Sequence, residues 1–388
     1  MFIHITNAQV FAPESLGVQH LLVAAGKIVS MSPDAIDLGS IENVVTVDAE
    51  GRRLIPGLVD GHSHINGGGG ESGYSSRVPT VKLSQYTGAG VTTVVGLLGT
   101  DDTVHTTGSL VTGARGLIDE GLSAYCYTGG YHVPCTTLTG SVRGDIVYID
   151  PIIGVGELAI SDHRSSQPTL DELLRVAADS HVAGMMTGKA GVVHLHLGDG
   201  ERRLSMVHDA IAQSEIPARV FNPTHVNRNE PLFLEAMELT KAGCTIDITA
   251  YPLVEGDTGI GADRALIRYL ESGCSPDHIT VSSDGGGCLP QFDDDGHVTR
   301  MGVGDPRVLL DVINALARVG VPLEDVVPAF TSNVARHLRL RYKGVVAKGC
   351  DADLVVLNED GSLWGTMAMG QWHVQDSQLL RLGQFENL

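Results

Sequence analysis

The chain has 388 residues, of which 43% are hydrophobic and 19% are charged. This composition is typical of a globular protein rather than a disordered one. A formal net charge of −20 argues against binding to nucleic acid or to an anionic membrane surface, because either partner would need a basic patch. The length suits one barrel-sized domain with a smaller appendage.

The cysteine pattern and the N-terminal residues indicate where in the cell the protein is found. The six cysteines are scattered and form no CxxC motif, which favours reduced thiols in a cytoplasmic protein. Residues 1–4 lack the basic segment and apolar run of a signal peptide, and no apolar stretch is long enough to span a bilayer. We therefore expect a cytoplasmic protein with no membrane partner.

The two ends of the chain have a β pattern. Residues 2–10, 21–31 and 44–47 resemble short strands separated by turns, and residues 343–357 are β-type again. Neither end could bury a core alone. We expect residues 1–55 and 337–388 to pair into one small β-sandwich domain.

Between the ends, strand patterns alternate with helical patterns. Eight strand-like runs occur at residues 55–64, 91–99, 123–134, 152–161, 192–198, 217–226, 244–250 and 279–285. Amphipathic stretches occur at residues 109–120, 170–183, 203–214, 231–242, 263–272 and 306–319. Repeated β-α units predict a parallel sheet, and eight of them predict a (β/α)₈ TIM-type barrel over residues 56–336. The alternative, an open doubly wound sheet, lacks its glycine fingerprint after the first strand.

Candidate metal ligands recur at one end of these strands. His62 and His64 end the first strand, and side chains two residues apart in a strand point the same way. Catalytic residues of barrels lie at the carboxyl ends of the strands. Four further candidates occupy comparable positions or lie within a strand: Glu157, His196, His225 and Asp284. This set predicts a site for two divalent metal ions, with zinc favoured because imidazole-rich sites prefer it to magnesium or calcium.

Two alternatives concern the ligands. Glu157 lies within an apolar strand, where a carboxylate needs a compensating charge that a bridging position between two cations would supply. A carbamylated Lys189 could also bridge, but it precedes the fifth strand rather than lying within the fourth. His194 alternates with His196 and should point away, into packing or behind the site.

With these residues in place, the chain resembles the amidohydrolase superfamily, whose small β domain is similar to the segment at residues 349–356. Within it, six local motifs are similar to the isoaspartyl dipeptidase family: residues 67–71, 96–101, 131–134, 161–164, 223–229 and 282–285. The resemblance implies hydrolysis of the isopeptide bond of β-aspartyl dipeptides by a binuclear metallohydrolase. It also implies a homo-oligomer, an octamer.

The expected mechanism uses a hydroxide shared by the two metals, whose pKa is lowered toward ~7. Asp284 would take its proton and pass it to the leaving amine. By resemblance, Tyr131 would donate a hydrogen bond to the oxyanion, the alternative being a packed tyrosine at the rim.

The expected substrate contacts follow from the free charged groups of a β-aspartyl dipeptide. Glu71 would face the ammonium group. Backbone N–H groups around Gly69, with Thr100 and marginally Cys288, would bind the α-carboxylate. Arg164 and Arg228 would clamp the carboxylate of the leaving residue, the alternative for either arginine being a surface ion pair.

The chain departs from the family pattern at two positions. Glu157 stands where the family carries a carbamylated lysine; it supplies the same charge without needing CO₂ but has a shorter reach. Cys288 stands where the family has a substrate-contacting serine, and a thiol is a weaker donor. Two rival functions remain open: a cyclic-amide hydrolase of the dihydroorotase or hydantoinase type, and a catalytically silent barrel used as a scaffold.

Overall fold

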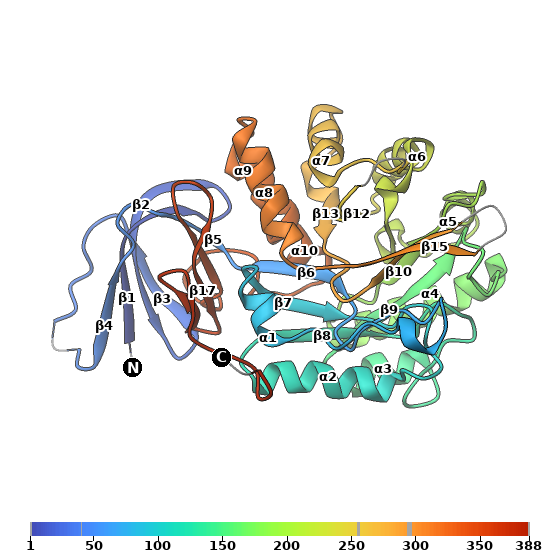
Figure 1. The fold of residues 1–388 in the computed structure, drawn as a ribbon, viewed down its shortest axis with the longest axis horizontal. Coiled ribbons are helices and arrows are strands. Elements are labelled where there is room, and N and C mark those ends of the chain that lie inside the picture. The colour runs from blue at the N-terminus through green and yellow to red at the C-terminus, as the bar shows by residue number, and fades with distance from the viewer. Residues whose placement is uncertain (1, 40, 254–256, 293–296, 387–388) are drawn as a thin grey trace.

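The computed structural model describes residues 2–39, 41–253, 257–292 and 297–386. The chain forms a parallel β/α unit and, beside it, a mixed sheet built from both chain ends (Figure 1). In Figure 1 the blue strands of the N-terminus and the red strands of the C-terminus lie together. The predicted fold class is confirmed.

Eight parallel strands carry the β/α unit, and each falls within one of the eight predicted runs. They are β6 (Leu58–Ser63), β7 (Val91–Gly96), β8 (Ser123–Thr128), β9 (Ile152–Ile160), β10 (Val193–Leu197), β11 (Phe221–Thr224), β12 (Ile246–Thr249) and β13 (Ile279–Ser282).

The pairing of these strands is that of a TIM-like barrel with one open seam. A continuous parallel ladder runs from β6 to β11, and β12 pairs with β13. A parallel bridge between Ser63 and Gly285 joins the first strand to the end of the last. Among the described residues no backbone ladder joins β11 to β12, and side chains span this seam instead: Thr224 Oγ1 donates to Asp247 Oδ2 at 2.7 Å.

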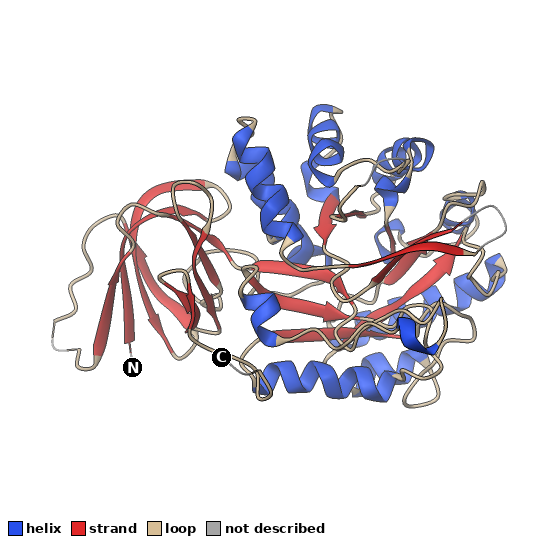
Figure 2. Ribbon diagram, in the orientation of Figure 1, coloured by secondary structure: helices blue, strands red, loops and turns tan. Residues whose placement is uncertain are grey.

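Helices cover the outside of the strands (Figure 2). The six predicted helical stretches all form helices, with ends displaced by a few residues. The helices are α1 (Leu83–Thr87), α2 (Thr107–Asp119), α3 (Val142–Tyr148), α4 (Leu170–Thr187), α5 (Ser205–Ala212), α6 (Glu230–Thr240), α7 (Ala262–Glu271), α8 (Val308–Arg318), α9 (Leu323–Val326) and α10 (Ser332–His337). No helix in the described part of the chain is long and apolar enough to cross a membrane.

The mixed sheet joins the two chain ends through β5 and β16, which pair antiparallel with Leu354 opposite Pro56. Of the predicted β segment at residues 343–357, only the last four residues form a strand. The preceding residues form turns and an isolated bridge between Asp351 and Lys27. The strands are β1 (Phe2–Phe11), β2 (Ser15–Ala24), β3 (Lys27–Ser32), β4 (Val44–Asp48), β5 (Arg53–Pro56), β16 (Leu354–Leu357), β17 (Leu363–Ala368), β18 (Gln371–Gln375) and β19 (Gln378–Leu379).

Apolar side chains fill the end of the barrel that faces away from the predicted ligands. Val59, Tyr127 and Val192 pack there against Val334 and Leu338 at α10. Apolar filling of this end leaves the opposite rim as the place where polar side chains meet.

A hairpin follows the last barrel strand and was not predicted. Its strands are β14 (Cys288–Phe292) and β15 (Val298–Val303), with Cys288 opposite Val303. Pro290 lies within the first strand, opposite Met301, and a proline within an apolar run argues against a strand when only the sequence is considered. In Figure 1, β15 crosses in front of the parallel strands.

Candidate active site

The six predicted ligands come from five strands and meet at one rim. His62 lies on β6, Glu157 on β9 and His196 on β10. The other three follow the ends of β6, β11 and β13: they are His64, His225 and Asp284. All six are buried.

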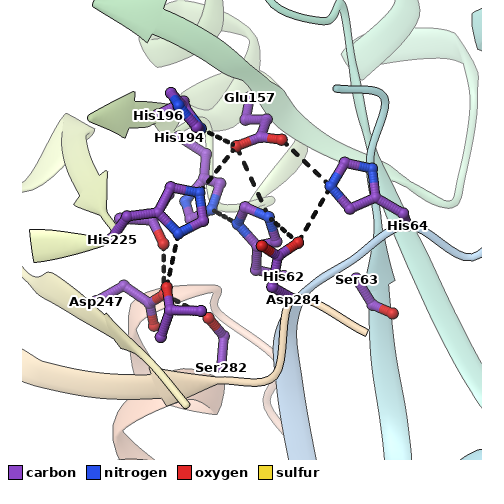
Figure 3. A network of polar contacts seen from close by, with 12 residues as sticks. His62, Ser63, His64, Glu157, His194, His196, His225, Asp247, Ser282 and Asp284 are labelled. Atoms are coloured by element: carbon purple, nitrogen blue, oxygen red, sulfur yellow. Dashed lines mark hydrogen bonds and ion pairs between the residues drawn. The ribbon is translucent and has the colours of Figure 1, made fainter. Parts of the chain in front are cut away.

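Distances between these side chains describe one compact cluster (Figure 3). His64 Nε2 lies 3.4 Å from Glu157 Oε1 and 3.2 Å from Asp284 Oδ1. Glu157 Oε2 lies 3.4 Å from His225 Nε2 and 3.7 Å from His62 Nε2. Glu157 therefore contacts His64 through one carboxylate oxygen and His225 and His62 through the other.

The donor set fits two divalent ions. In two groups the ligand atoms lie within 4.8 Å of one another: His62 with His64 and Asp284, and His62 with Glu157 and His225. His62 Nε2 and Asp284 Oδ1 are buried without a hydrogen-bond partner, which a metal ion would supply. His196 is in neither group, but its Nδ1 lies 3.0 Å from Glu157 Oε2.

The electrostatics favour ionised carboxylates at neutral pH. Burial opposes the charge on Glu157, yet His62 and the hydrogen bonds from neighbouring imidazoles hold its pKa well below the ordinary value. Asp284 is also buried, and its contacts with His62 and His64 likewise lower its pKa. Burial lowers the pKa of His225 to about 3. Burial is outweighed by the same two carboxylates, which raise the pKa of His62 and raise that of His64 to about 10, so a metal ion that binds here would displace protons from these two imidazoles.

A carboxylate to which sequence reasoning gave no role holds His196. Asp162 Oδ2 lies 2.9 Å from His196 Nε2, and the same oxygen accepts from Arg164 Nη2 at 2.7 Å. Burial opposes its charge, but His196 and Arg164 outweigh burial and lower its pKa. Asp162 lies within the motif at residues 161–164, so the motif was the available signal.

The alternative bridge, a carbamylated Lys189, is wrong. Its Nζ donates to the carbonyl oxygens of Ile146 and Ile149 at 2.6 and 2.8 Å. These carbonyls lie before β9, whereas the ligand cluster follows the carboxyl ends of the strands. Lys189 thus cannot reach the imidazoles.

A cavity of about 550 Å³ opens above the cluster. Of the thirteen site residues predicted from the sequence, all except the deeper His62 line it. The substrate-binding candidates among its walls are Gly69, Glu71, Thr100, Tyr131, Arg164, Arg228 and Cys288.

Glu71 and Arg228 present unpaired atoms within this cavity wall. Glu71 Oε1 accepts from Thr100 Oγ1 at 3.0 Å, and its Oε2 is buried without a hydrogen-bond partner. Arg228 Nη1 lies 3.7 Å from Asp199 Oδ2, while its Nε has no partner. Buried polar atoms left in this state are suited to a charged ligand.

Arg164 and Tyr131 are held more firmly. The Arg164 side chain donates two hydrogen bonds to Asp162, and its Nη1 lies 3.4 Å from Glu71 Oε1. The Tyr131 hydroxyl lies 2.8 Å from His196 Nδ1. Burial raises the pKa of Tyr131 well above its ordinary value, so the phenol stays protonated and can donate a hydrogen bond.

The unpredicted hairpin supplies much of the outer wall. Leu289, Gln291 and Arg300 line the cavity from β14 and β15, opposite Tyr251. Gln291 Nε2 also donates to Asp257 across the opening. The sequence carried no periodic signal for these contacts.

Two residues of the cluster have a left-handed backbone. His225 has φ 59° and Asp284 has φ 52°. Non-glycine residues rarely adopt this conformation, although histidine and aspartate are among those that tolerate it better. The rotation lets both side chains turn inward directly after their strands end.

Comparison with known proteins agrees with this geometry. The amidohydrolase family model matches residues 260–373. A β-aspartyl dipeptidase from Fervidobacterium islandicum AW-1, solved in complex with a β-Asp-Leu dipeptide, is 41% identical over 100% of this chain and 99% of its own, with a TM-score of 0.94. The chain belongs to the β-aspartyl dipeptidase family of the amidohydrolase superfamily.

Two other solved structures are similar to this chain, one from the same family and one at low sequence identity. A second structure of the Fervidobacterium β-aspartyl dipeptidase is 39% identical over the full length of both chains, with a TM-score of 0.90. A dihydropyrimidinase from Brevibacillus agri covers 99% of this chain and 97% of its own at 16% identity and a TM-score of 0.67. At that identity the likeness shows a shared fold and no shared substrate.

Proposed function

We propose that this protein hydrolyses the isopeptide bond of β-aspartyl dipeptides. One observation carries the proposal: the relative solved with β-Asp-Leu matches the whole chain at 41% identity. The cavity adds a physical reason, because an anion at Glu71 and cations at Arg164 and Arg228 line its walls above a histidine-rich cluster.

His62, His64, Glu157, His196, His225 and Asp284 would hold two divalent ions, with zinc favoured by the imidazole-rich donor set. When bound, such ions polarise a carbonyl and lower the pKa of water toward neutrality.

Asp284 and Tyr131 would supply the proton transfers and hydrogen bonds of the reaction. Asp284 has an unpartnered Oδ1 that faces His62 and His64. As an ionised carboxylate at the rim of the cavity, it would take a proton from the attacking water and return it to the leaving amine. Tyr131, protonated at neutral pH, would donate a hydrogen bond to the oxygen of the scissile carbonyl.

The ends of the dipeptide would be recognised by charge. The free α-ammonium group of the β-linked aspartate would lie at Glu71 Oε2, which has no other partner. Its α-carboxylate would lie near Gly69, Thr100 and Cys288. Arg228, supported by Arg164, would bind the carboxylate of the leaving residue through paired N–H donors.

A coupled assay that detects released leucine tests this function. The zinc-loaded protein should hydrolyse β-Asp-Leu and leave α-Asp-Leu intact. Dihydropyrimidine and hydantoin substrates serve as controls for the cyclic-amide alternative. Cleavage of the cyclic amides with no cleavage of β-Asp-Leu would overturn the substrate, and no reaction with any of them would favour a silent scaffold.

Glu157 allows a second test, on how the metal site assembles. Because a glutamate needs no CO₂ to become a ligand, zinc should restore full activity to the apo protein in buffer free of carbon dioxide and bicarbonate. A requirement for bicarbonate would contradict the assignment of Glu157 as the ligand that replaces a carbamylated lysine.

Three further features belong to the proposal. All six cysteines are free, in keeping with a cytoplasmic enzyme. Family resemblance favours a homo-oligomer, an octamer, which sedimentation would test. We also retain the domain limits at residues 1–55, 56–336 and 337–388, which limited proteolysis would test.

A further inference from the structure

A buried chain of hydrogen bonds lies behind His62, on the side away from the cavity. His62 Nδ1 lies 2.8 Å from His194 Nε2, and His194 Nδ1 lies 2.7 Å from Asn222 Oδ1. Asn222 Nδ2 donates to the carbonyl oxygen of Thr245 at 2.7 Å. None of His62, His194 and Asn222 is more than 3% exposed. Figure 3 shows His194 beside His62.

The backbone fixes the direction of this chain. A carbonyl oxygen only accepts, so the amide group of Asn222 must face Thr245 with its NH₂ and His194 with its oxygen. The reverse orientation would set two oxygens 2.7 Å apart. Asn222 Oδ1 only accepts, so His194 must carry its proton on Nδ1.

The same reasoning continues to His62. Among the described residues, the hydrogen-bond and ring partners of His194 are His62, Asn222 and Tyr127, whose ring stacks on it with centroids 5.1 Å apart. None of the three is an anion, so a protonated His194 would be a buried cation without a direct partner. A neutral His194 with its proton on Nδ1 accepts at Nε2. His62 must then donate from Nδ1, so a neutral His62 carries its lone pair on Nε2, the ring atom that faces Glu157 and Asp284.

We propose that His194 and Asn222 form a tautomer lock that holds His62 with its Nε2 lone pair directed at the metal site. This Nε2 is buried without a hydrogen-bond partner and belongs to both candidate ligand groups. His194 and Asn222 are positioning residues, since they act on metal and substrate only through His62. The lock also spans the seam between β11 and β12, where side chains replace the backbone ladder. The proposal rests on the proposed metal site.

Two variants of His194 test the lock, with zinc affinity of the apo protein as the readout. His194→Gln keeps an oxygen able to accept from His62, whereas His194→Met has a similar length and no strong acceptor. Losing a partner behind a metal ligand typically weakens metal binding about 10–100-fold, and we expect this loss for His194→Met. His194→Gln should stay within about threefold of wild type, because it keeps the hydrogen bond that orients the ligand.

Two further measurements separate the lock from general packing. With Co²⁺ in place of zinc, the visible spectrum should change in His194→Met and persist in His194→Gln. Asn222→Leu removes the hydrogen-bond partner of His194 Nδ1 and can be tested in place of His194→Met if that variant does not fold. The double variant Asn222→Leu/His194→Met should bind zinc no more weakly than the weaker single variant, because both act through one route.

The outcomes distinguish the two proposals. Wild type that binds no zinc overturns both the metal site and the lock. If the wild-type protein binds zinc and hydrolyses β-Asp-Leu, and His194→Met binds zinc equally tightly, the lock alone is overturned. Equal weakening in His194→Gln and His194→Met, or additive losses in the double variant, would likewise contradict it.

Discussion

Two clusters of buried charge stand at opposite places in this molecule and differ in how their atoms are satisfied. Between the barrel and the mixed sheet, Lys343 Nζ contacts Asp353 at 2.6 Å, Asp351 at 2.8 Å and the Ser123 hydroxyl at 2.6 Å. At the rim, His62 Nε2 and Asp284 Oδ1 have no hydrogen-bond partner. We call the Lys343 cluster closed, because its charged atoms are paired within the chain, and the rim cluster open, because it contains buried atoms that form no hydrogen bond.

The comparison teaches that burial of charge alone does not mark a functional site. Both clusters contain buried carboxylates, and a buried charge is costly unless it is paired. The Lys343 cluster balances its charges within the chain and joins two units. In the rim cluster, His62 Nε2 and Asp284 Oδ1 lie 3.4 Å apart and neither forms a hydrogen bond, which indicates room for a ligand.

The largest effect should follow from breaking the open cluster at its centre. Glu157→Ala removes the carboxylate that faces His64, His196 and His225, so both metal ions and the activity should be lost together. We expect the hydrolysis rate to fall at least about 1,000-fold, measured with the metal content of the purified protein. Wild-type metal content with a wild-type rate would remove Glu157 from the ligands.

Breaking the closed cluster should instead reduce stability. Lys343→Met leaves the buried Asp353 without its cation, while Asp351 keeps Lys27 at 2.6 Å. Removing one partner of a buried pair costs about 3–5 kcal/mol. Urea unfolding should show this loss, while activity per folded molecule stays at the wild-type level. A variant of unchanged stability would mean that the cluster is not a structural clamp.

A buried histidine in the mixed sheet should make the stability of the protein depend on pH without affecting the rim cluster. His373 on β18 is fully buried, and burial, aided by the charge on Arg381, lowers its pKa from 6.5 to about 4. The unfolded chain therefore binds this proton more readily, so folding stability is lost as the pH falls from 6.5 to 4. One pKa unit corresponds to about 1.36 kcal/mol, which gives a loss of up to about 3 kcal/mol.

His373→Phe should remove this contribution. The difference in unfolding free energy between pH 7 and pH 4 should shrink by the same amount relative to wild type, with activity at pH 7 unaffected. An identical pH dependence of stability in the two proteins would contradict the assignment. Unlike the rim imidazoles, His373 belongs to neither of the two groups of side chains that could hold a metal ion among the described residues.

The smallest effect concerns the outer part of the open cluster. Arg228→Met removes a guanidinium group with an unpartnered Nε, and hydrogen bonds to charged groups contribute about 1.5–3 kcal/mol. The Michaelis constant for β-Asp-Leu should rise about 10–100-fold, while zinc content stays at the wild-type level. An unchanged Michaelis constant would count against the carboxylate clamp.

The sequence predicted the eight strands and the meeting of six ligand candidates because barrel topology does most of that work. Parallel strands bring their carboxyl ends to one rim, so residues such as His62 and Asp284, far apart along the chain, must converge. A strand period of two was enough to separate His194 from His196.

The remaining contacts depend on side-chain partners that no periodicity encodes. The bond between Asp162 and His196, and the chain from His62 to Asn222, join different strands and depend on register and rotamer. The hairpin β14–β15 was missed because Pro290 breaks its pattern. Its residues line the outer cavity, so the sequence predicted the chemistry of the site better than its shape.

The left-handed backbone at His225 and Asp284 bears on attempts to make the enzyme more heat-resistant. Such conformations cost on the order of 1 kcal/mol each for residues other than glycine. Glycine at either position would relax the backbone and discard a ligand in the same step. Screens that select only for a higher melting temperature should therefore drift toward inactive proteins at these two positions, and engineering should hold both fixed.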